Sequence, residues 1–62
     1  MATSRRVDGP TPNGGDYSEV YFLTNDNVLT DESRATKAEV VEYTTGGKLV
    51  HRTYLTIGKE TQ

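Results

Sequence analysis

The residue best suited to acid–base chemistry in this sequence is His51, its only histidine. Imidazole titrates near neutral pH, but a catalytic histidine also needs an orienting carboxylate and a nucleophile or substrate within reach. If Glu42 faces His51 across a hairpin, Glu42 supplies the carboxylate and Thr44 or Thr53 a hydroxyl. Any hairpin of mixed composition contains such a trio. We therefore interpret His51 as structural and predict no catalytic residues and no enzymatic activity.

The sequence also predicts neither a metal site nor a cofactor. It has 62 residues and no cysteine, which rules out disulfides and thiolate clusters, and one histidine cannot build a histidine-rich site. The acids near Asp26 and Asp31 fall short of the alternating oxygen ligands of a calcium loop. The glycine pairs Gly14–Gly15 and Gly46–Gly47 lack the residue pattern of a phosphate-binding loop.

Charge is distributed unevenly along the chain. From Glu19 to Glu42 there are six acids and two bases, whereas from Tyr43 to Lys59 there are three bases and no acid. The simplest interpretation is that an acidic strand pairs with a basic one. The alternative is a small nucleic-acid-binding domain, in which a basic strand flanked by tyrosines stacks on bases, although the net charge of −2 argues against a general polyanion binder. Its contact residues would be Arg5, Arg6, Lys48 and Arg52.

The four tyrosines favour a different function, the binding of a protein. Tyrosine contributes apolar area and a polar tip, a combination that suits interfaces, although packing at the edge of the core also accounts for it. We predict a small non-enzymatic protein-interaction module that acts through a sheet face or an edge strand. Its partner is another protein or a second copy of the chain. The predicted contact residues are Tyr21, Tyr43, Arg52 and Tyr54.

The elements that must position these residues begin after a polar segment. Residues 1–16 contain two prolines, three of the six glycines and a single large apolar residue, Val7. Such a segment buries too little apolar surface to offset its ordering entropy, so we expect a disordered arm, or alternatively a strand that docks on a partner. We expect one domain over residues 17–58 and a frayed end at 59–62.

We predict that the domain is a small three-stranded antiparallel sheet. Strands are predicted near 18–24, 36–44 and 48–57, with one short helical turn near 31–35, where Asp31 and Glu32 favour a helix start. Residues 35–42 also have roughly helical spacing, but Val40, Val41 and Tyr43 prefer strands.

Two registers are open at the Gly46–Gly47 turn. A tight two-residue turn pairs Ala38 with Leu55, Val40 with Thr53 and Glu42 with His51. A three-residue loop with left-handed Gly47 pairs Tyr43 with Leu49, Val41 with His51 and Val40 with Arg52.

Neither register places apolar residues on one face and polar residues on the other. In a sheet with one solvent-exposed face, apolar and polar residues should alternate along each strand. A sheet with apolar residues on both faces needs a cover, so we expect a homodimer. No apolar run approaches the roughly 18–20 residues that span a bilayer, and no apolar stretch of a secretory signal follows the N-terminal arginines. We therefore expect a cytoplasmic protein without membrane contact or a small-molecule substrate.

Overall fold

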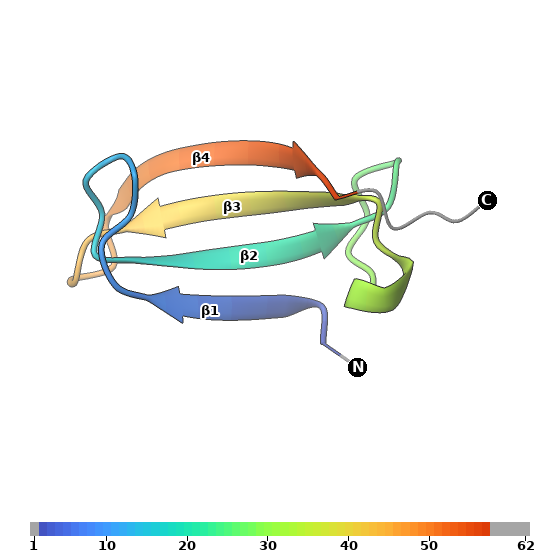
Figure 1. Cartoon of the computed structure of the whole chain (residues 1–62), viewed down its shortest axis with the longest axis horizontal. Coiled ribbons are helices and arrows are strands. Elements are labelled where there is room, and N and C mark those ends of the chain that lie inside the picture. Colours follow the sequence, from blue (N-terminus) through green and yellow to red (C-terminus); the bar gives the residue numbers. More distant parts are fainter. Residues whose placement is uncertain (1, 58–62) are drawn as a thin grey trace.

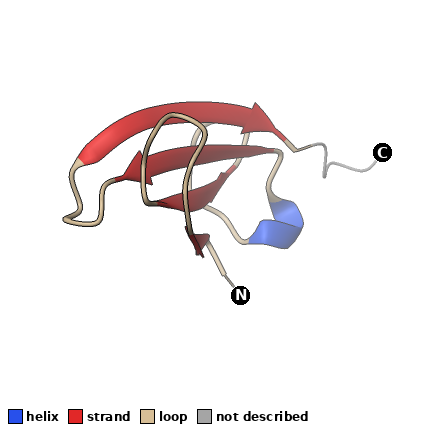
Figure 2. Ribbon diagram, turned by 60° about the vertical axis from the view of Figure 1, so that its left-hand side comes forward, coloured by secondary structure: helices blue, strands red, loops and turns tan. Residues whose placement is uncertain are grey.

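The computed structural model describes residues 2–57 as a four-stranded antiparallel sheet, with each strand beside its neighbour in sequence (Figure 1). The strands are β1 (Ser4–Asp8), β2 (Tyr17–Leu23), β3 (Lys37–Tyr43) and β4 (Leu49–Thr56), and a short 3-10 helix, η1 (Glu32–Arg34), lies between β2 and β3. Figure 2 shows the strands as one curved layer with η1 beside it. The mainly β, antiparallel fold with one helical turn is therefore confirmed.

The prediction of three strands is wrong, because β1 forms a fourth strand in the segment expected to be a disordered arm. It pairs with β2 from Ser4↔Tyr21 to Asp8↔Tyr17. All five of its residues are exposed, so β1 is held by ladder hydrogen bonds and cross-strand contacts. Composition alone misses such a strand, because composition reports burial and not backbone pairing. The frayed end expected at 59–62 lies outside the described residues.

The segment that could have been helix or strand is the strand β3. Its β-branched residues Val40 and Val41 lie in the middle of the sheet, where β2 and β4 pair with both of its edges. Such residues pack well on a pleated surface and lose side-chain freedom in a helix. Tertiary pairing therefore decides against the helical spacing.

The β3–β4 hairpin uses both predicted registers, one after the other. Along the strands the pairs are those of the tight turn, from Ala38↔Leu55 to Glu42↔His51. At the tip, Tyr43 pairs with Leu49, as in the three-residue loop. The loop shifts the register by one residue, and the unpaired Val50 shifts it back. The predicted bulge pairs of Val40 and Val41 are therefore wrong, and the pairing of Tyr43 is right.

Gly47 closes the hairpin loop in the left-handed region, with φ of +89°. Its N–H donates to the Thr44 carbonyl at 2.9 Å, and the Thr44 N–H donates to the Lys48 carbonyl at 2.9 Å. A glycine adopts this backbone conformation at no steric cost, which explains the second glycine of the pair. Gly46, in contrast, has no positive φ.

The register defines two faces, because directly opposite residues and alternate residues along a strand share a side. The tyrosine face carries the aromatic and charged side chains Arg6, Asp8, Tyr17, Glu19, Tyr21, Lys37, Glu39, Tyr43, Arg52 and Tyr54, together with the apolar Leu23, Val41 and Leu49. The apolar face carries Arg5, Val7, Ser18, Val20, Phe22, Ala38, Val40, Glu42, His51, Thr53 and Leu55. The buried hydrophobic residues are few: Phe22, Leu23, Ala35, Ala38 and Val41.

Candidate functional site

All four predicted contact residues lie on the tyrosine face. Tyr21 in β2 and Tyr54 in β4 flank Glu39 of β3, which pairs with both of them. Arg52 is opposite Val41, on the same side as Tyr54, and Tyr43 ends the β3 row. The sequence patterns identified these residues individually. The sheet brings them together on one surface.

A stack of three side chains extends this surface to β1. The rings of Tyr17 and Tyr43 stack with centroids 5.2 Å apart and an interplanar angle of 23°. The Arg6 guanidinium lies 4.0 Å from the centre of the Tyr17 ring, where the ring quadrupole attracts a cation. Tyr17 was not among the predicted contact residues, and Arg6 was assigned to nucleic-acid contacts. The unexpected pairing of β1 with β2 brings Arg6 here, whereas Tyr17 lies here because it starts β2 opposite Tyr43 of β3.

Two glutamates hold the polar tips of the tyrosine face in place. Glu39 accepts a hydrogen bond from the Tyr54 hydroxyl at 3.3 Å and forms an ion pair with Arg52 at 3.0 Å. Glu19 accepts a hydrogen bond from the Tyr21 hydroxyl, and this bond, with burial, raises the pKa of Tyr21 above its usual range. The tips are thus ordered before any ligand arrives. This arrangement suits recognition, because little side-chain freedom remains to be lost on binding.

The trio considered for catalysis lies on the opposite face. Glu42 pairs with His51, and Thr53 is two residues further along β4. However, Glu42 is only 4% exposed, since the β1–β2 loop covers it. Its carboxylate accepts hydrogen bonds from the Thr11 hydroxyl at 2.6 Å, the Asn13 N–H at 3.1 Å and the Asn13 side-chain amide at 2.8 Å.

These hydrogen bonds anchor the β1–β2 loop to the Glu42 carboxylate. The bond from Thr11 contributes most to holding the pKa of Glu42 below its usual value, followed by those from Asn13. A carboxylate with a lowered pKa is a weaker base. The geometry therefore supports a structural role for Glu42 more than a catalytic one.

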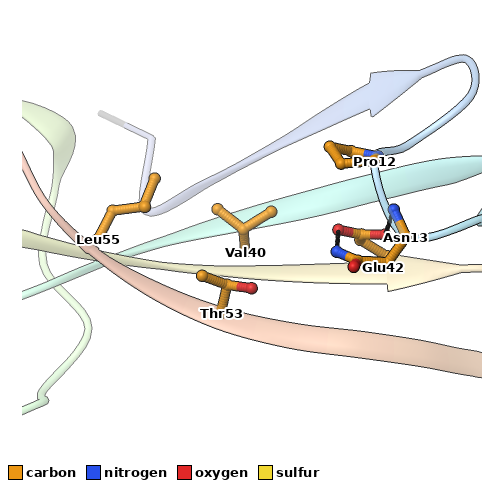
Figure 3. A pocket seen from close by; sticks show the side chains of 6 residues that line it. All are labelled: Pro12, Asn13, Val40, Glu42, Thr53 and Leu55. Carbon is orange, nitrogen blue, oxygen red and sulfur yellow. Dashed lines mark hydrogen bonds between the residues drawn. The ribbon is translucent and has the colours of Figure 1, made fainter.

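Beside the loop anchor, the apolar face is hollowed by a depression of about 330 Å³ (Figure 3). Val40, Thr53 and Leu55 rise from β3 and β4 on the side of the sheet where Pro12 of the loop lies. The other lining residues are Asn13 and Glu42. Apart from this polar end, the depression is lined by apolar groups, which suits an apolar occupant.

The four basic residues of the nucleic-acid hypothesis do not form one surface. Arg6 and Arg52 lie on the tyrosine face, Arg5 on the apolar face, and Lys48 in the hairpin loop. The three arginines are neutralised by neighbouring acids: Arg5 by Glu32 at 2.6 Å, Arg6 by Asp8 at 2.7 Å and Arg52 by Glu39 at 3.0 Å. This arrangement offers little free positive charge to a phosphate backbone.

Residues 2–57 contain no group of three or more histidine, aspartate or glutamate side chains arranged to hold a metal ion. No helix in the described part of the chain is both long and apolar enough to cross a membrane. Comparisons of the chain with protein-family models, with curated proteins and with solved structures find no match.

Proposed function

We propose that this chain is a small non-enzymatic protein-interaction module whose tyrosine face contacts a protein partner. The observation that carries the proposal is the gathering of Tyr21, Tyr43, Arg52 and Tyr54 on one side of the sheet, beside the stacked Tyr17. We include a cytoplasmic location in the proposal, because a cysteine-free sequence suits a reducing compartment.

The composition of this face suits a protein surface. Tyrosine and arginine are enriched among the residues that dominate binding energy at protein interfaces. Tyr54 is 58% exposed, and the Arg52 side chain is 54% exposed. Each therefore has accessible area to lose to a partner, while Glu39 fixes the position of its polar group.

The charges on the tyrosine face further indicate a partner of mixed composition. Arg6 and Arg52 are balanced by Asp8 and Glu39 at short distance. A strongly acidic or basic partner would have to break these pairs, whereas a partner with apolar and hydrogen-bonding groups can leave them intact. The same pairs make the nucleic-acid alternative less favourable, since phosphate contacts need free cations.

The test starts from a partner captured from an extract of the source cells with the wild-type chain and then purified. Its affinity is measured by calorimetry for the wild type, Tyr54→Ala and Arg52→Ala. We expect each substitution to weaken binding about tenfold or more, because truncating such residues costs more than about 1 kcal/mol.

The matched control is Val28→Ala, at a residue 59% exposed in the loop after β2. It should bind within about twofold of the wild type, since its ΔΔG should stay within about 0.5 kcal/mol. Wild-type affinity of Tyr54→Ala and Arg52→Ala would refute the proposal. Tight binding of single-stranded DNA or RNA that weakens steeply with salt would favour the nucleic-acid alternative instead.

A further inference from the structure

We propose that a second copy of this chain packs against the apolar face by two-fold symmetry, so that two four-stranded sheets form a sandwich. This interface is on the side of the sheet opposite the tyrosine face. The inference therefore goes beyond the proposed function and does not depend on it.

The hydrophobic core of the single sheet is incomplete. Among residues 2–57 no large side chain is fully buried. On the apolar face Val7 and Leu55 are each 48% exposed, and Val20 and Val40 are only half-buried although they lie on the two central strands. Domains normally bury a sheet face against a second layer. Here one layer is present, and the second must come from outside the described chain.

The uncovered area lies at the centre of the apolar face. The β1–β2 loop covers one end of the apolar face, through the bonds of Thr11 and Asn13 to Glu42. At the other end Glu32 of η1 reaches Arg5, whose guanidinium lies 5.6 Å from the centre of the Phe22 ring. The centre is left open, and it holds the apolar depression of about 330 Å³ (Figure 3).

The centre of the apolar face also lacks charged groups. Within the described strands this face carries three ionisable side chains: Arg5, Glu42 and His51. Arg5 is paired with Glu32 at 2.6 Å, Glu42 is enclosed by the loop, and His51 lies opposite Glu42 at the loop end of the face. The open centre around Val40 therefore holds no ionisable side chain of the described strands, and it neither attracts a charged partner nor repels an identical face. A two-fold interface requires such self-complementarity.

The single layer of strands, which lie side by side in Figure 1, also suits a sandwich. Two sheets packed about 10 Å apart would bring the valines of both copies into contact.

The test is sedimentation velocity of the full chain from about 1 to 500 µM, a range that brackets micromolar self-association. We expect the wild type to sediment as a dimer at the upper end. Leu55→Lys should raise the dimer dissociation constant about 30-fold or more, because it removes a half-exposed leucine from each copy and inserts two charges.

The matched control is Leu49→Lys. Leu49 lies on the same strand and is 50% exposed, but it is opposite Tyr43 and so on the tyrosine face. The dissociation constant of this variant should stay within about threefold of the wild type. A monomeric wild type at every concentration would overturn the inference, and so would equal weakening by both variants.

A second measurement does not depend on whether the variants fold. In a mixture of isotope-labelled and unlabelled wild-type chains, filtered NOE spectra report contacts between copies. Contacts between Val40 or Leu55 methyls of different copies support the proposed interface. Intermolecular contacts confined to the tyrosine rings would exclude it.

Discussion

Gly47→Ala tests the hairpin on which the positions of Arg52 and Tyr54 depend. Gly47 has φ of +89°, and its N–H closes the loop on Thr44. A methyl group there would lie 3.9 Å from the Tyr17 hydroxyl, which is ordinary contact. The cost is therefore one of backbone conformation and not of space.

The magnitude follows from two opposing effects. A left-handed backbone costs an L-residue about 1–2 kcal/mol. Alanine also restricts the unfolded chain, which offsets about 0.4–1 kcal/mol of that cost. Gly47→Ala should therefore destabilise the fold by about 1 kcal/mol, which lowers the Tm of a domain of this size by roughly 4–8 °C.

Gly46→Ala is the matched control. Gly46 has no positive φ, and a methyl group added there would lie 4.0 Å from the Thr44 hydroxyl oxygen, which is ordinary contact. We expect it to be neutral or to stabilise by up to about 1 kcal/mol. The assay is thermal unfolding followed by circular dichroism, with all chains at one concentration because self-association would shift the Tm. Equal Tm values for the two variants would refute the left-handed loop.

Two further predictions concern the β1–β2 loop. Gly15→Ala should destabilise the fold by about 1–3 kcal/mol. A methyl group at this buried residue would lie only 2.7 Å from the Thr11 hydroxyl oxygen and 3.0 Å from the Tyr43 carbonyl oxygen. A urea unfolding curve unchanged from that of the wild type would show that the loop does not pack so closely. The pKa of Glu42 in the folded chain lies below the ordinary value of 4.5. The Glu42 carboxylate therefore stabilises the fold fully above about pH 4.5, and this stabilisation is lost as the pH falls through the lowered folded-state pKa. Glu42→Gln should therefore flatten the fall in stability between about pH 5 and 2, as measured by urea unfolding at each pH, and an unaltered acid profile would mean that the carboxylate does not anchor the loop.

The three C-terminal strands follow from local patterns. Runs rich in β-branched and aromatic residues and a glycine pair at the turn predict β2, β3 and β4. The strand β1 could not be predicted in this way. Its sequence SRRVD carries one apolar residue, and its stability comes from pairing with β2, from Ser4↔Tyr21 to Asp8↔Tyr17. That contribution is seen only in the strand pairing of the folded sheet.

The register illustrates a second limit of the sequence. The glycine pair suits both a tight two-residue turn and a three-residue loop with left-handed Gly47, so the sequence leaves two registers as alternatives. The unpaired Val50 allows both by shifting the register back after one residue. No residue type specifies such a bulge, so it depends on which face the remaining side chains must reach.

The candidate site, too, could be predicted only in part from the sequence. Residue types single out Tyr21, Tyr43, Arg52 and Tyr54 as candidate contact residues, but they do not show that all four share a face. The contribution of Arg6 depends on β1, and that of Tyr17 on a β2 that begins one residue earlier than the predicted strand, so both were missed. The loop that covers Glu42 was also missed, because the prolines and glycines of residues 9–16 were interpreted as disorder.

The central claim is that self-association covers the apolar face and leaves the tyrosine face free for a partner. The most direct measurement is the NMR relaxation caused by a soluble paramagnetic agent, recorded for the wild-type chain at low and high concentration. We predict that the Val40 and Leu55 methyls lose accessibility as the concentration rises, while the Tyr54 ring remains accessible. Protection of Tyr54 with continued exposure of Leu55 would contradict the account.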